Sequence, residues 1–218
     1  MNMIFTLVSE ATLETLAMVG FSTVFSLILG LPLGILLCVT DGETGIMKKP
    51  VLNQVLTRIV NVLRSFPFMI LMILLFPLSR KIVGTSIGTT ATIVPLSIAA
   101  APFVARIIET ALKEVDPGVV QAARAMGSTN MQIIWKVLLP EAMPSLVSGI
   151  TLTIINLIGY SAMAGAIGGG GLGDLAIRYG YQRFRTDIMA VSVIVILVLV
   201  EVIQVNKTKI SSKLLAKR

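Results

Sequence analysis

The stretch VVQAARAMGSTNMQIIWKVLLPEA, residues 119–142, decides how the rest of the chain is interpreted, because it is polar among neighbours that are apolar. Hydrophobic residues make up 55% of the 218 residues, charged residues make up 13%, and the mean hydropathy is +0.92. A soluble domain of this composition would expose large apolar patches, so the composition predicts an all-α protein that crosses a membrane several times. Residues 119–142 do not suit lipid and need another explanation.

The start of this region predicts a short helix. Asp116 offers a side-chain acceptor for a free backbone N–H, and Pro117 lacks an N–H at the first helical position, where none is needed. We therefore expect a helix from about Pro117 to Met126.

A tight turn and a second helix are expected next. Gly127 suits the left-handed residue that closes a helix, and Thr129 with Gln132 has the spacing of a capping box. The second helix is expected to end near Leu139 and Pro140. We call residues 116–136 the elbow.

The first helix of the elbow carries one small apolar face. Its members recur at spacings of three and four residues, whereas Gln121 and Arg124 point elsewhere. Such a face suits insertion into a groove on another protein, and it equally suits an amphipathic connector lying on the membrane surface. The residues of the face are Val119, Ala122, Ala123 and Met126.

Five apolar stretches are long enough to span a bilayer, whose core of about 30 Å needs about 20 residues per helix. No cleavable signal peptide is expected before the first of them. The five stretches are Leu16 to Thr40, Ile59 to Leu78, Ser86 to Ala105, Leu146 to Ala166 and Asp187 to Val205.

The distribution of Lys and Arg favours one orientation. With the C-terminus inside, the cytoplasmic segments hold twelve Lys and Arg residues and the outer segments hold five. This count favours N-out, C-in and places the elbow in the cytoplasm. The chain then divides into an extracytoplasmic segment (1–11), a membrane domain (12–206) and a basic cytoplasmic tail (207–218).

Glycine and proline recur within the spans. Gly30 and Gly34 lie four residues apart, which would let another backbone approach closely. Pro67, Pro95 and Pro102 interrupt regular helical hydrogen bonding. Ordinary helix packing explains these residues most simply, and moving helices are the alternative.

The sequence lacks the residues that several kinds of functional site require. The chain has no His, and its single cysteine, Cys38, lies in an apolar run, so a metal site, a disulfide framework and a catalytic triad are not expected. The net charge of +7 is dispersed between apolar runs rather than gathered on one face, which argues against nucleic acid as a partner. No catalytic residue is predicted.

The segment IGGGGLG, residues 167–173, contains Gly168, Gly170 and Gly173 at the spacing of a dinucleotide-binding motif. That motif needs a buried strand before it, whereas this segment follows a membrane span. No phosphate-binding loop of the form Gly-x-x-x-x-Gly-Lys occurs, so energy for any work must come from a partner or a gradient. Flexible backbone at the outer end of the fourth span is the better interpretation.

Tyr160, Ser161 and Met163, which precede this segment, are candidates for the lining or gate of a translocation pathway. Tyr160, Ser161 and Met163 offer an aromatic ring, a hydroxyl and a thioether, which would let an apolar side chain pass without tight binding. Simple interior packing is the alternative for Tyr160 and Met163.

Gln121-Ala122-Ala123, then Gly127, then Val137-x-Leu139-Pro140 resembles the EAA loop of type I ABC-importer permeases. Among these, the chain is most similar to methionine-importer permeases. Gln121 stands where the wider family usually has Glu, which puts an ion pair with the partner in doubt. The stretches that carry the similarity are ETLAM (14–18), RSFPF (64–68), IVGTSIG (82–88), RAMGSTNMQI (124–133), KVLLPEAMP (136–144) and GYSAMAGAIGGGGLG (159–173).

This resemblance implies a permease subunit in a bacterial inner or plasma membrane that pairs with a second copy of itself. It implies an extracytoplasmic binding protein or lipoprotein that delivers methionine, D or L, and a cytoplasmic ATPase dimer that binds ATP and Mg²⁺. The permease chain itself would hold no cofactor. The residues implied in coupling to the ATPase are Gln121, Ala122, Ala123, Arg124, Met126 and Gly127.

Two other functions stay open on the residues alone. A gradient-driven carrier or small channel usually places ionisable groups deep in the membrane, and the apolar runs here hold few. A membrane scaffold that transports nothing would use the elbow for docking but would not need the Gly and Pro pattern.

Overall fold

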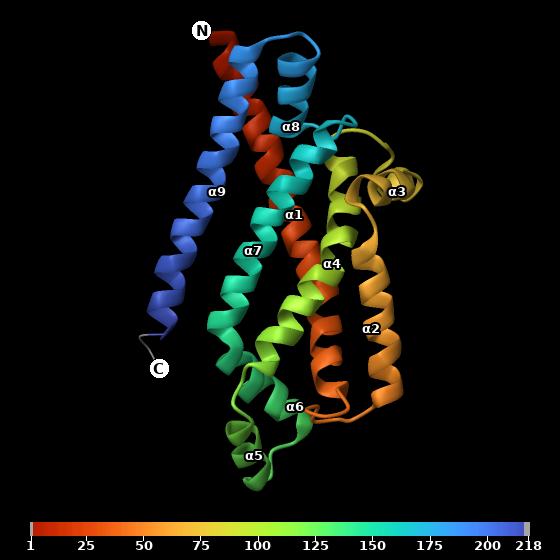
Figure 1. Cartoon of the computed structure of the whole chain (residues 1–218), viewed down its shortest axis with the longest axis vertical. Coiled ribbons are helices and arrows are strands. Elements are labelled where there is room, and N and C mark those ends of the chain that lie inside the picture. Colours follow the sequence, from red (N-terminus) through yellow and green to blue (C-terminus); the bar gives the residue numbers. More distant parts are fainter. Residues whose placement is uncertain (1, 216–218) are drawn as a thin grey trace. The chain divides into compact units, whose positions relative to one another are not determined.

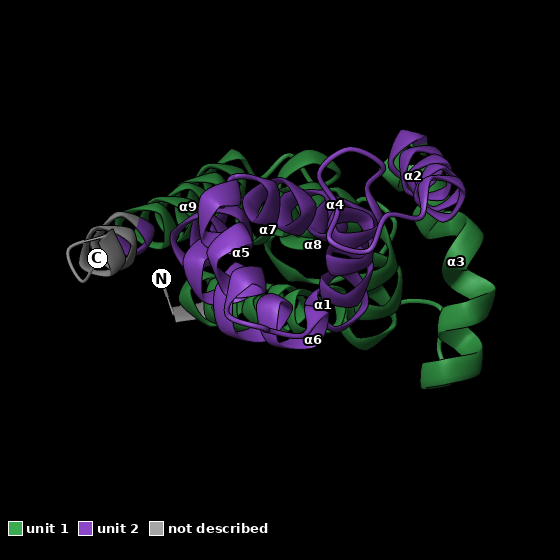
Figure 2. Ribbon diagram, turned by 90° about the horizontal axis from the view of Figure 1, so that it is seen from below, with its two compact units in different colours: residues 1–26, 66–100, 153–205 green, residues 27–65, 101–152, 206–218 purple. Residues whose placement is uncertain are grey.

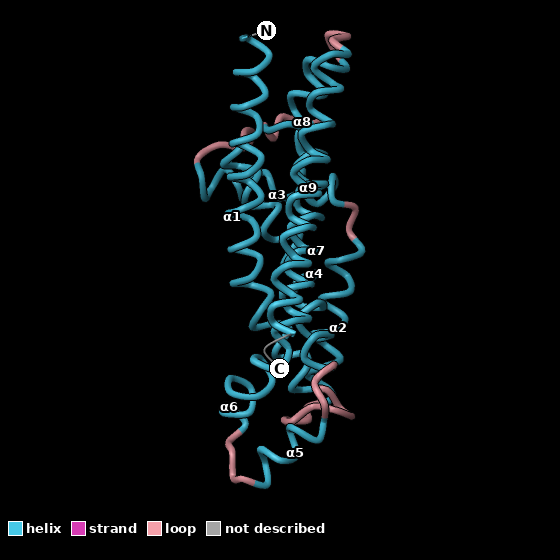
Figure 3. The backbone as a smooth tube through the Cα atoms, turned by 90° about the vertical axis from the view of Figure 1, so that its left-hand side faces the viewer, coloured by secondary structure: helices cyan, strands magenta, loops and turns pink. Residues whose placement is uncertain are grey.

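The computed structural model describes residues 2–215, with side chains from Ile4 to Lys207. All regular elements in that range are helical, which confirms the predicted fold class (Figures 1 and 3). The α-helices are α1 (Asn2–Thr40), α2 (Pro50–Ser65), α3 (Phe68–Val83), α4 (Thr89–Lys113), α5 (Pro117–Ala125), α6 (Asn130–Ile133), α7 (Leu139–Gly165), α8 (Gly171–Leu175) and α9 (Thr186–Leu215). Two π-helical turns, η1 (Ile134–Leu138) and η2 (Ala176–Tyr181), precede α7 and follow α8.

Four described segments are long and apolar enough to cross a membrane. They are Ile4–Thr40, Thr89–Lys113, Asn130–Gly165 and Thr186–Lys207, and α2 with α3 would make a fifth, broken span. Four of the five predicted spans therefore overlap a long apolar helix.

The predicted second span, Ile59 to Leu78, was wrong as a single helix. The chain leaves the helical conformation at Phe66 and Pro67, and Pro67 has φ −59° and ψ 127°. Proline cannot donate to the helical ladder, and its ring pushes the preceding residue out of the α conformation. The interruption therefore follows from Pro67, which the sequence had already marked.

The predicted end of the second elbow helix was also wrong. The helix continues through Leu139 and Pro140 into α7, by way of the π-helical turn η1, in which Leu139 N–H donates to Ile134 C=O. A proline inside a helix clashes with the carbonyl four residues earlier, and the wider π turn changes that local geometry.

Helices extend into both predicted terminal segments. Helix α1 begins at Asn2, so the segment expected at 1–11 is helical from its second residue. Helix α9 continues to Leu215 into the predicted basic tail, 207–218, whose last three residues lie outside the described residues.

The chain divides into two compact units, which Figure 2 colours separately. Helices α1, α4, α7 and α9 each contribute one part to each unit. Among the described residues, unit 1 comprises residues 2–26, 66–100 and 153–205, and unit 2 comprises residues 27–65, 101–152 and 206–215.

In unit 2, α1 packs closely against α4 through two glycines. A Cβ atom on Gly30 would lie 2.8 Å from the carbonyl oxygen of Ala101, and one on Gly34 would lie 2.6 Å from that of Ala105. Only a residue without a side chain allows this approach, so the predicted role of Gly30 and Gly34 is confirmed. The rest of the contact is apolar and includes Val104.

In unit 1, a separate apolar cluster joins α1, α4 and α7. Met18, Leu96 and Leu157 are fully buried in it. Phe68 of α3 packs against this cluster, so the segment after the Pro67 interruption is fixed by side-chain packing within the unit.

Candidate functional site

The helix caps and the turn of the elbow have the local structure that the sequence predicts. The side chain of Asp116 accepts a hydrogen bond from Gly118 N–H at 2.7 Å. Thr129 and Gln132 form the reciprocal capping box, and Gly127 has φ +80°. These contacts satisfy backbone donors at both helix starts and close the turn between the two short helices.

Helix α5 has two apolar faces rather than one. Ala123 is buried and packs into the core of unit 2 with Ile133, and Val120 packs beside it. Val119 and Met126 are exposed, Met126 by 80%. The predicted face was therefore wrong in one member, because Ala123 holds the helix to its own unit while Val119, Ala122 and Met126 face outward.

Polar residues of α5 contact a second segment, residues 41–49. Arg124 donates a hydrogen bond to the carbonyl oxygen of Ile46 at 2.9 Å. Gln121 and Arg124 line a hollow of about 350 Å³ together with Glu43 and Lys48. Two of the predicted coupling residues, Gln121 and Arg124, thus lie next to a loop that the sequence did not connect with them.

Asp41 fixes the start of that loop. Its Oδ1 accepts hydrogen bonds from Glu43 N–H at 2.9 Å and Thr44 N–H at 3.0 Å, and its Oδ2 pairs with Lys113 Nζ at 2.8 Å. The Lys113 ammonium, with the two backbone amides, holds the pKa of Asp41 well below its usual value. The loop is therefore tied to α4 by a charge-assisted hydrogen bond.

A polar ladder extends from this pair along α4. Glu109 is buried and accepts hydrogen bonds from Lys113 at 2.9 Å and from Arg106 at 2.7 Å. Arg106 also donates to Asn61 of α2 at 2.8 Å. Sequence reasoning missed this ladder, although the spacing of 106, 109 and 113 on one helix face was a readable signal.

In unit 1, the glycine-rich segment lies against two distant parts of the chain. Gly88 N–H donates to the carbonyl oxygen of Gly168 at 3.0 Å. Gly171 N–H donates to the carboxylate of Glu14 at 2.7 Å, and Leu172 N–H donates to the hydroxyl of Thr15 at 2.9 Å. Three stretches quoted for the family resemblance, ETLAM, IVGTSIG and the glycine-rich stretch, therefore meet at one place.

The ion pair of Asp174 with Arg178 lies beside the contact between the glycine-rich segment and Glu14. Burial raises the pKa of Asp174 above its usual value, and nearby Glu14 acts in the same direction. The ion pair with Arg178, at 2.6 Å, opposes the rise without cancelling it.

The three candidate pathway residues lie in different surroundings in unit 1. Tyr160 is half-buried and its ring stacks on Phe68, with centroids 4.5 Å apart. Ser161 is buried and donates to the carbonyl oxygen of Ile158 at 2.8 Å. Met163 is 50% exposed, so it is the member of the set whose side chain is most available to a second molecule.

No group of three or more Cys, Asp or Glu side chains within the described residues could hold a metal ion.

Residues 30–206 match the family model described as "Binding-protein-dependent transport system inner membrane component". The chain belongs to this family of permease subunits of ABC importers.

Similar proteins of known name narrow the class of permease that this chain resembles. The chain is 52% identical over 198 residues to the probable D-methionine transport system permease protein MetI of Vibrio cholerae, covering 91% of this chain and 88% of that one. It is 53% identical over 153 residues to MetI of Escherichia coli, and 51% identical over 153 residues to the methionine import system permease protein MetP of Bacillus subtilis. Each of these two matches covers 70% of this chain, and they cover 70% and 69% of MetI and MetP.

Solved structures of ABC transporters also match this chain. A chain of the MetNI methionine ABC transporter in an inward-facing conformation matches with a TM-score of 0.96 and 45% identity, over 98% of this chain and 99% of that one. An amino acid ABC transporter with histidines matches with a TM-score of 0.79 at 19% identity, over 96% of this chain and 94% of that one, which shows a shared fold alone.

Proposed function

We propose that this chain is the membrane subunit of an ATP-driven methionine importer, with the elbow as the contact through which a cytoplasmic ATPase drives it. Two copies of the chain form the translocation pathway, two ATPase subunits bind ATP and Mg²⁺, and an extracytoplasmic binding protein delivers methionine. Residues 12–206 make up the permease domain. The names of the relatives support the substrate and the ATPase partner.

One observation carries the coupling role. Helix α5 is held rigidly by its caps, by buried Ala123 and by Arg124, yet its outward side presents Val119, Ala122 and Met126. A rigid helix with exposed apolar side chains suits a cleft on a soluble partner, because the burial of those side chains provides affinity and the caps preserve orientation. Gly127 supports this arrangement by closing the helix.

The orientation follows from the same proposal. The elbow must face the ATPase, which puts the N-terminus outside and the C-terminus inside a bacterial inner or plasma membrane, as the distribution of Lys and Arg favours. The tail at 207–218 then lies in the cytoplasm.

For the pathway, exposed Met163 is the proposed gate, with Tyr160 fixed beside it by the Phe68 ring and Ser161 held by its own helix. In alternating access, movement of the elbows of the two copies changes which side of the membrane the pathway opens to.

The test is ATP-dependent methionine uptake in proteoliposomes that contain this chain, its ATPase and its binding protein. Gly127→Pro removes the left-handed conformation and the hydrogen bond from Gly127 N–H to Arg124 C=O, so uptake should collapse. Gly127→Asn is the matched control, because Asn tolerates a positive φ, and it should retain most of the uptake.

Uptake that proceeds without the ATPase would instead support a gradient-driven carrier. Equal uptake by the two Gly127 variants would remove the elbow from the coupling mechanism.

A further inference from the structure

The end of η2 and the turn that joins it to α9 gather arginine and aromatic side chains at the upper end of α9 in Figure 1. We call residues 178–185 the arginine loop. Neither the elbow nor the candidate pathway residues belong to it. Its arginines are Arg178, Arg183 and Arg185, and its aromatic residues are Tyr179, Tyr181 and Phe184.

The arginine loop is fixed to unit 1. Tyr179 packs against the apolar cluster around buried Ile188. The N–H of Arg185 donates to the carbonyl oxygen of Tyr179 at 3.2 Å, which closes the loop. A Cβ atom on Gly180 would lie 2.8 Å from the Cβ of Met189, so the lack of a side chain lets η2 pack against the start of α9. The exposed side chains of the loop are therefore presented on a fixed backbone.

Phe184 has an unfavourable backbone conformation and an exposed ring. Among the described residues, it is the one non-glycine residue with a positive φ, +55°. That conformation costs free energy in a residue with a Cβ atom. The ring is 85% exposed, so burial within the chain does not offset the cost. Such conformations are concentrated at sites that bind a partner, and the combination indicates that the ring contacts something outside the chain.

Two of the three arginines in the loop have carboxylate partners. Arg178 pairs with Asp174 at 2.6 Å, and Arg185 pairs with Asp187 at 2.7 Å. Each of these pairs is neutral, so the charge that remains in the loop is that of Arg183.

Arg183 forms no ion pair with a carboxylate of the described residues. Its guanidinium lies over the ring of Tyr179, 4.5 Å from the centroid. A guanidinium that is stacked on a ring keeps the N–H groups at its edge available, and their fork matches the oxygens of a phosphate.

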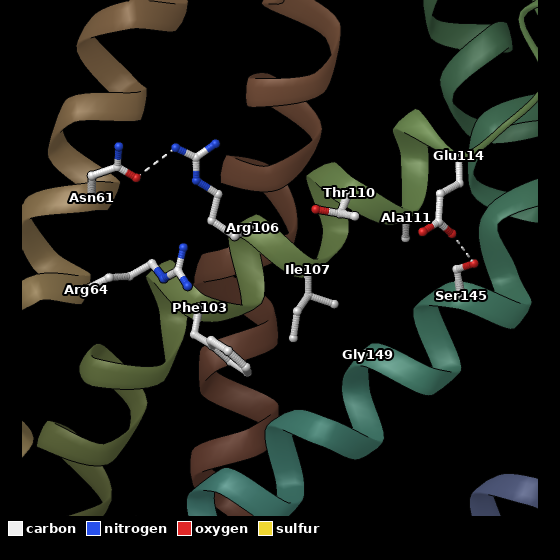
Figure 4. Close-up of a pocket in the computed structure, with 10 residues that line it drawn as sticks. All are labelled: Asn61, Arg64, Phe103, Arg106, Ile107, Thr110, Ala111, Glu114, Ser145 and Gly149. Atoms are coloured by element: carbon white, nitrogen blue, oxygen red, sulfur yellow. Dashed lines mark hydrogen bonds between the residues drawn. The ribbon is translucent and has the colours of Figure 1, made fainter.

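Arg106 in unit 2 is, by contrast, an arginine whose donors are used within the chain. It lines a hollow that Arg64 and Glu114 also line, and it donates to the side chain of Asn61 at 2.8 Å (Figure 4). It also pairs with Glu109 at 2.7 Å. Arg183 has neither kind of partner in the described part of the chain, so its N–H groups are left for a partner outside it.

The length of the span that follows places the arginine loop at the membrane surface. This span, Thr186–Lys207, has 22 residues, or about 33 Å at 1.5 Å per residue, close to the ~30 Å of the hydrocarbon core. The residues just before Thr186 therefore lie in the headgroup layer, which is about 5–7 Å thick on each side. Exposed aromatic rings, such as those of Tyr181 and Phe184, are typical of this layer.

The surroundings of α9 favour lipid over a soluble protein as the partner of the loop. Of the four described spans, Thr186–Lys207 is the least buried within the chain. Its exposed side chains are apolar and include Ile194, Leu197 and Val198, which suits contact with acyl chains. The headgroups above those acyl chains are then next to the arginine loop.

We propose that the arginine loop is an interfacial anchor that binds the phosphate of an anionic phospholipid, with Arg183 as the donor and the rings of Tyr181 and Phe184 between neighbouring headgroups. An anionic headgroup neutralises Arg183, whereas a zwitterionic one brings a further positive charge next to three arginines. This inference goes beyond the proposed function and does not depend on the transported solute. In the proposed orientation, the anchor lies in the outer headgroup layer.

The experiment uses the complete transporter in phosphatidylcholine nanodiscs that contain a small fraction of phosphatidylglycerol with a photoreactive diazirine near its headgroup. After irradiation, mass spectrometry should find the label on residues 181–185. Arg183→Gln should reduce this labelling about fivefold, the effect of one basic residue at an anionic membrane surface. Arg80→Gln, at an exposed arginine of α3 outside the loop, is the matched control and should leave labelling of the loop unchanged.

Phe184→Gly separates lipid binding from folding. Glycine adopts a positive φ readily, so the thermal unfolding midpoint in detergent should not fall, whereas labelling should decrease because the ring is lost. A lower midpoint with unchanged labelling would show that the ring serves the fold, and the anchor would then be refuted.

Competition identifies the partner of the loop. Unlabelled phosphatidylglycerol should displace the label, and an equal amount of phosphatidylethanolamine should not. Equal labelling of wild type and Arg183→Gln, or equal displacement by the two lipids, would overturn the proposal. Loss of labelling when the extracytoplasmic binding protein is added would also overturn it, because the loop would then be a surface for docking a protein.

Discussion

The elbow turn and the glycine-rich segment both depend on glycines with positive φ, but for different physical reasons. Gly127 has φ +80°, and a Cβ atom added there would meet nothing within 4 Å. Gly171 has φ +76°, and its added Cβ would lie 2.6 Å from Thr15 Oγ1 and 2.7 Å from Met18 Cε. At Gly127 the backbone conformation alone requires glycine, whereas at Gly171 a close approach to α1 requires it as well.

This difference separates a turn specified by its neighbours in sequence from one specified by distant contacts. The elbow takes its caps from Asp116, Thr129 and Gln132, all within a few residues of the turn. The glycine-rich segment takes its hydrogen-bond acceptors from Glu14 and Thr15, 157 residues away in the chain. Mutations should therefore have local effects in the first and effects on the whole of unit 1 in the second.

The largest expected effect is that of Gly171→Ala. The left-handed conformation and the collision with two buried side chains together should cost about 3 kcal/mol of unfolding free energy. Gly127→Ala adds strain only, and should cost about 1 kcal/mol. Thermal unfolding in detergent, followed by the reaction of buried Cys38 with a thiol dye, measures both. Equal losses for the two variants would contradict the distinction between the turns.

A second pair of variants tests the hydrogen-bond acceptors of the two turns instead of their glycines. Thr15→Val keeps the side-chain shape but leaves buried Leu172 N–H without its acceptor, at a cost of about 2 kcal/mol. Thr129→Val removes an exposed helix cap and should cost about 1 kcal/mol. Hydrogen exchange should rise across unit 1 for the first variant and only in residues 127–133 for the second. Exchange confined to residues 170–173 in Thr15→Val would show that the segment is less coupled to α1 than its contacts indicate.

The loop beside the elbow, which Asp41 fixes, and the glycine-rich segment, beside which Asp174 lies, should also respond to pH in opposite senses. The pKa of Asp41 is lowered, so its ion pair stabilises the fold above the usual value of 3.8, and that contribution is lost as pH falls through the lower folded-state pKa. The pKa of Asp174 is raised above 3.8, so its contribution is present at low pH and is lost as pH rises through the folded-state pKa.

Asp41→Asn should therefore cost about 1 kcal/mol at neutral pH, with the difference from wild type shrinking in acid. For Asp174→Asn the stability relative to wild type should improve as pH rises from 4 towards neutrality. Unfolding midpoints of both variants across pH measure this, and parallel pH profiles would refute the assignment of opposite shifts.

The smallest expected effect is that of Gln121→Glu, which restores the acid found in the wider family. Gln121 is exposed and lines a hollow that already holds one acid, Glu43, and three bases, Lys48, Lys113 and Arg124. We expect a change in ATP-dependent uptake of less than about twofold, because exposed charges contribute little. A large gain in uptake, reversed by added salt, would mean that the glutamine had removed an ion pair with the ATPase.

Sequence alone determined the features that rest on neighbouring residues. The caps at Asp116 and Thr129, the left-handed Gly127 and the apolar spans are interactions within a few residues or averages over about twenty, so a single chain reveals them. The close approach at Gly30 and Gly34 was also readable, because two small residues four apart form a patch on one helix face.

Only the tertiary structure decided which distant residues meet. Nothing near Glu14 in the chain indicates that its carboxylate accepts a hydrogen bond from Gly171, or that Arg64 and Glu114 share a hollow. The sequence does not distinguish Ala123 from its neighbour Ala122, but Ala123 is buried in the core of unit 2 and Ala122 is exposed. Helix periodicity states which residues share a face, but the packing of other helices states which face is covered, and that information is non-local.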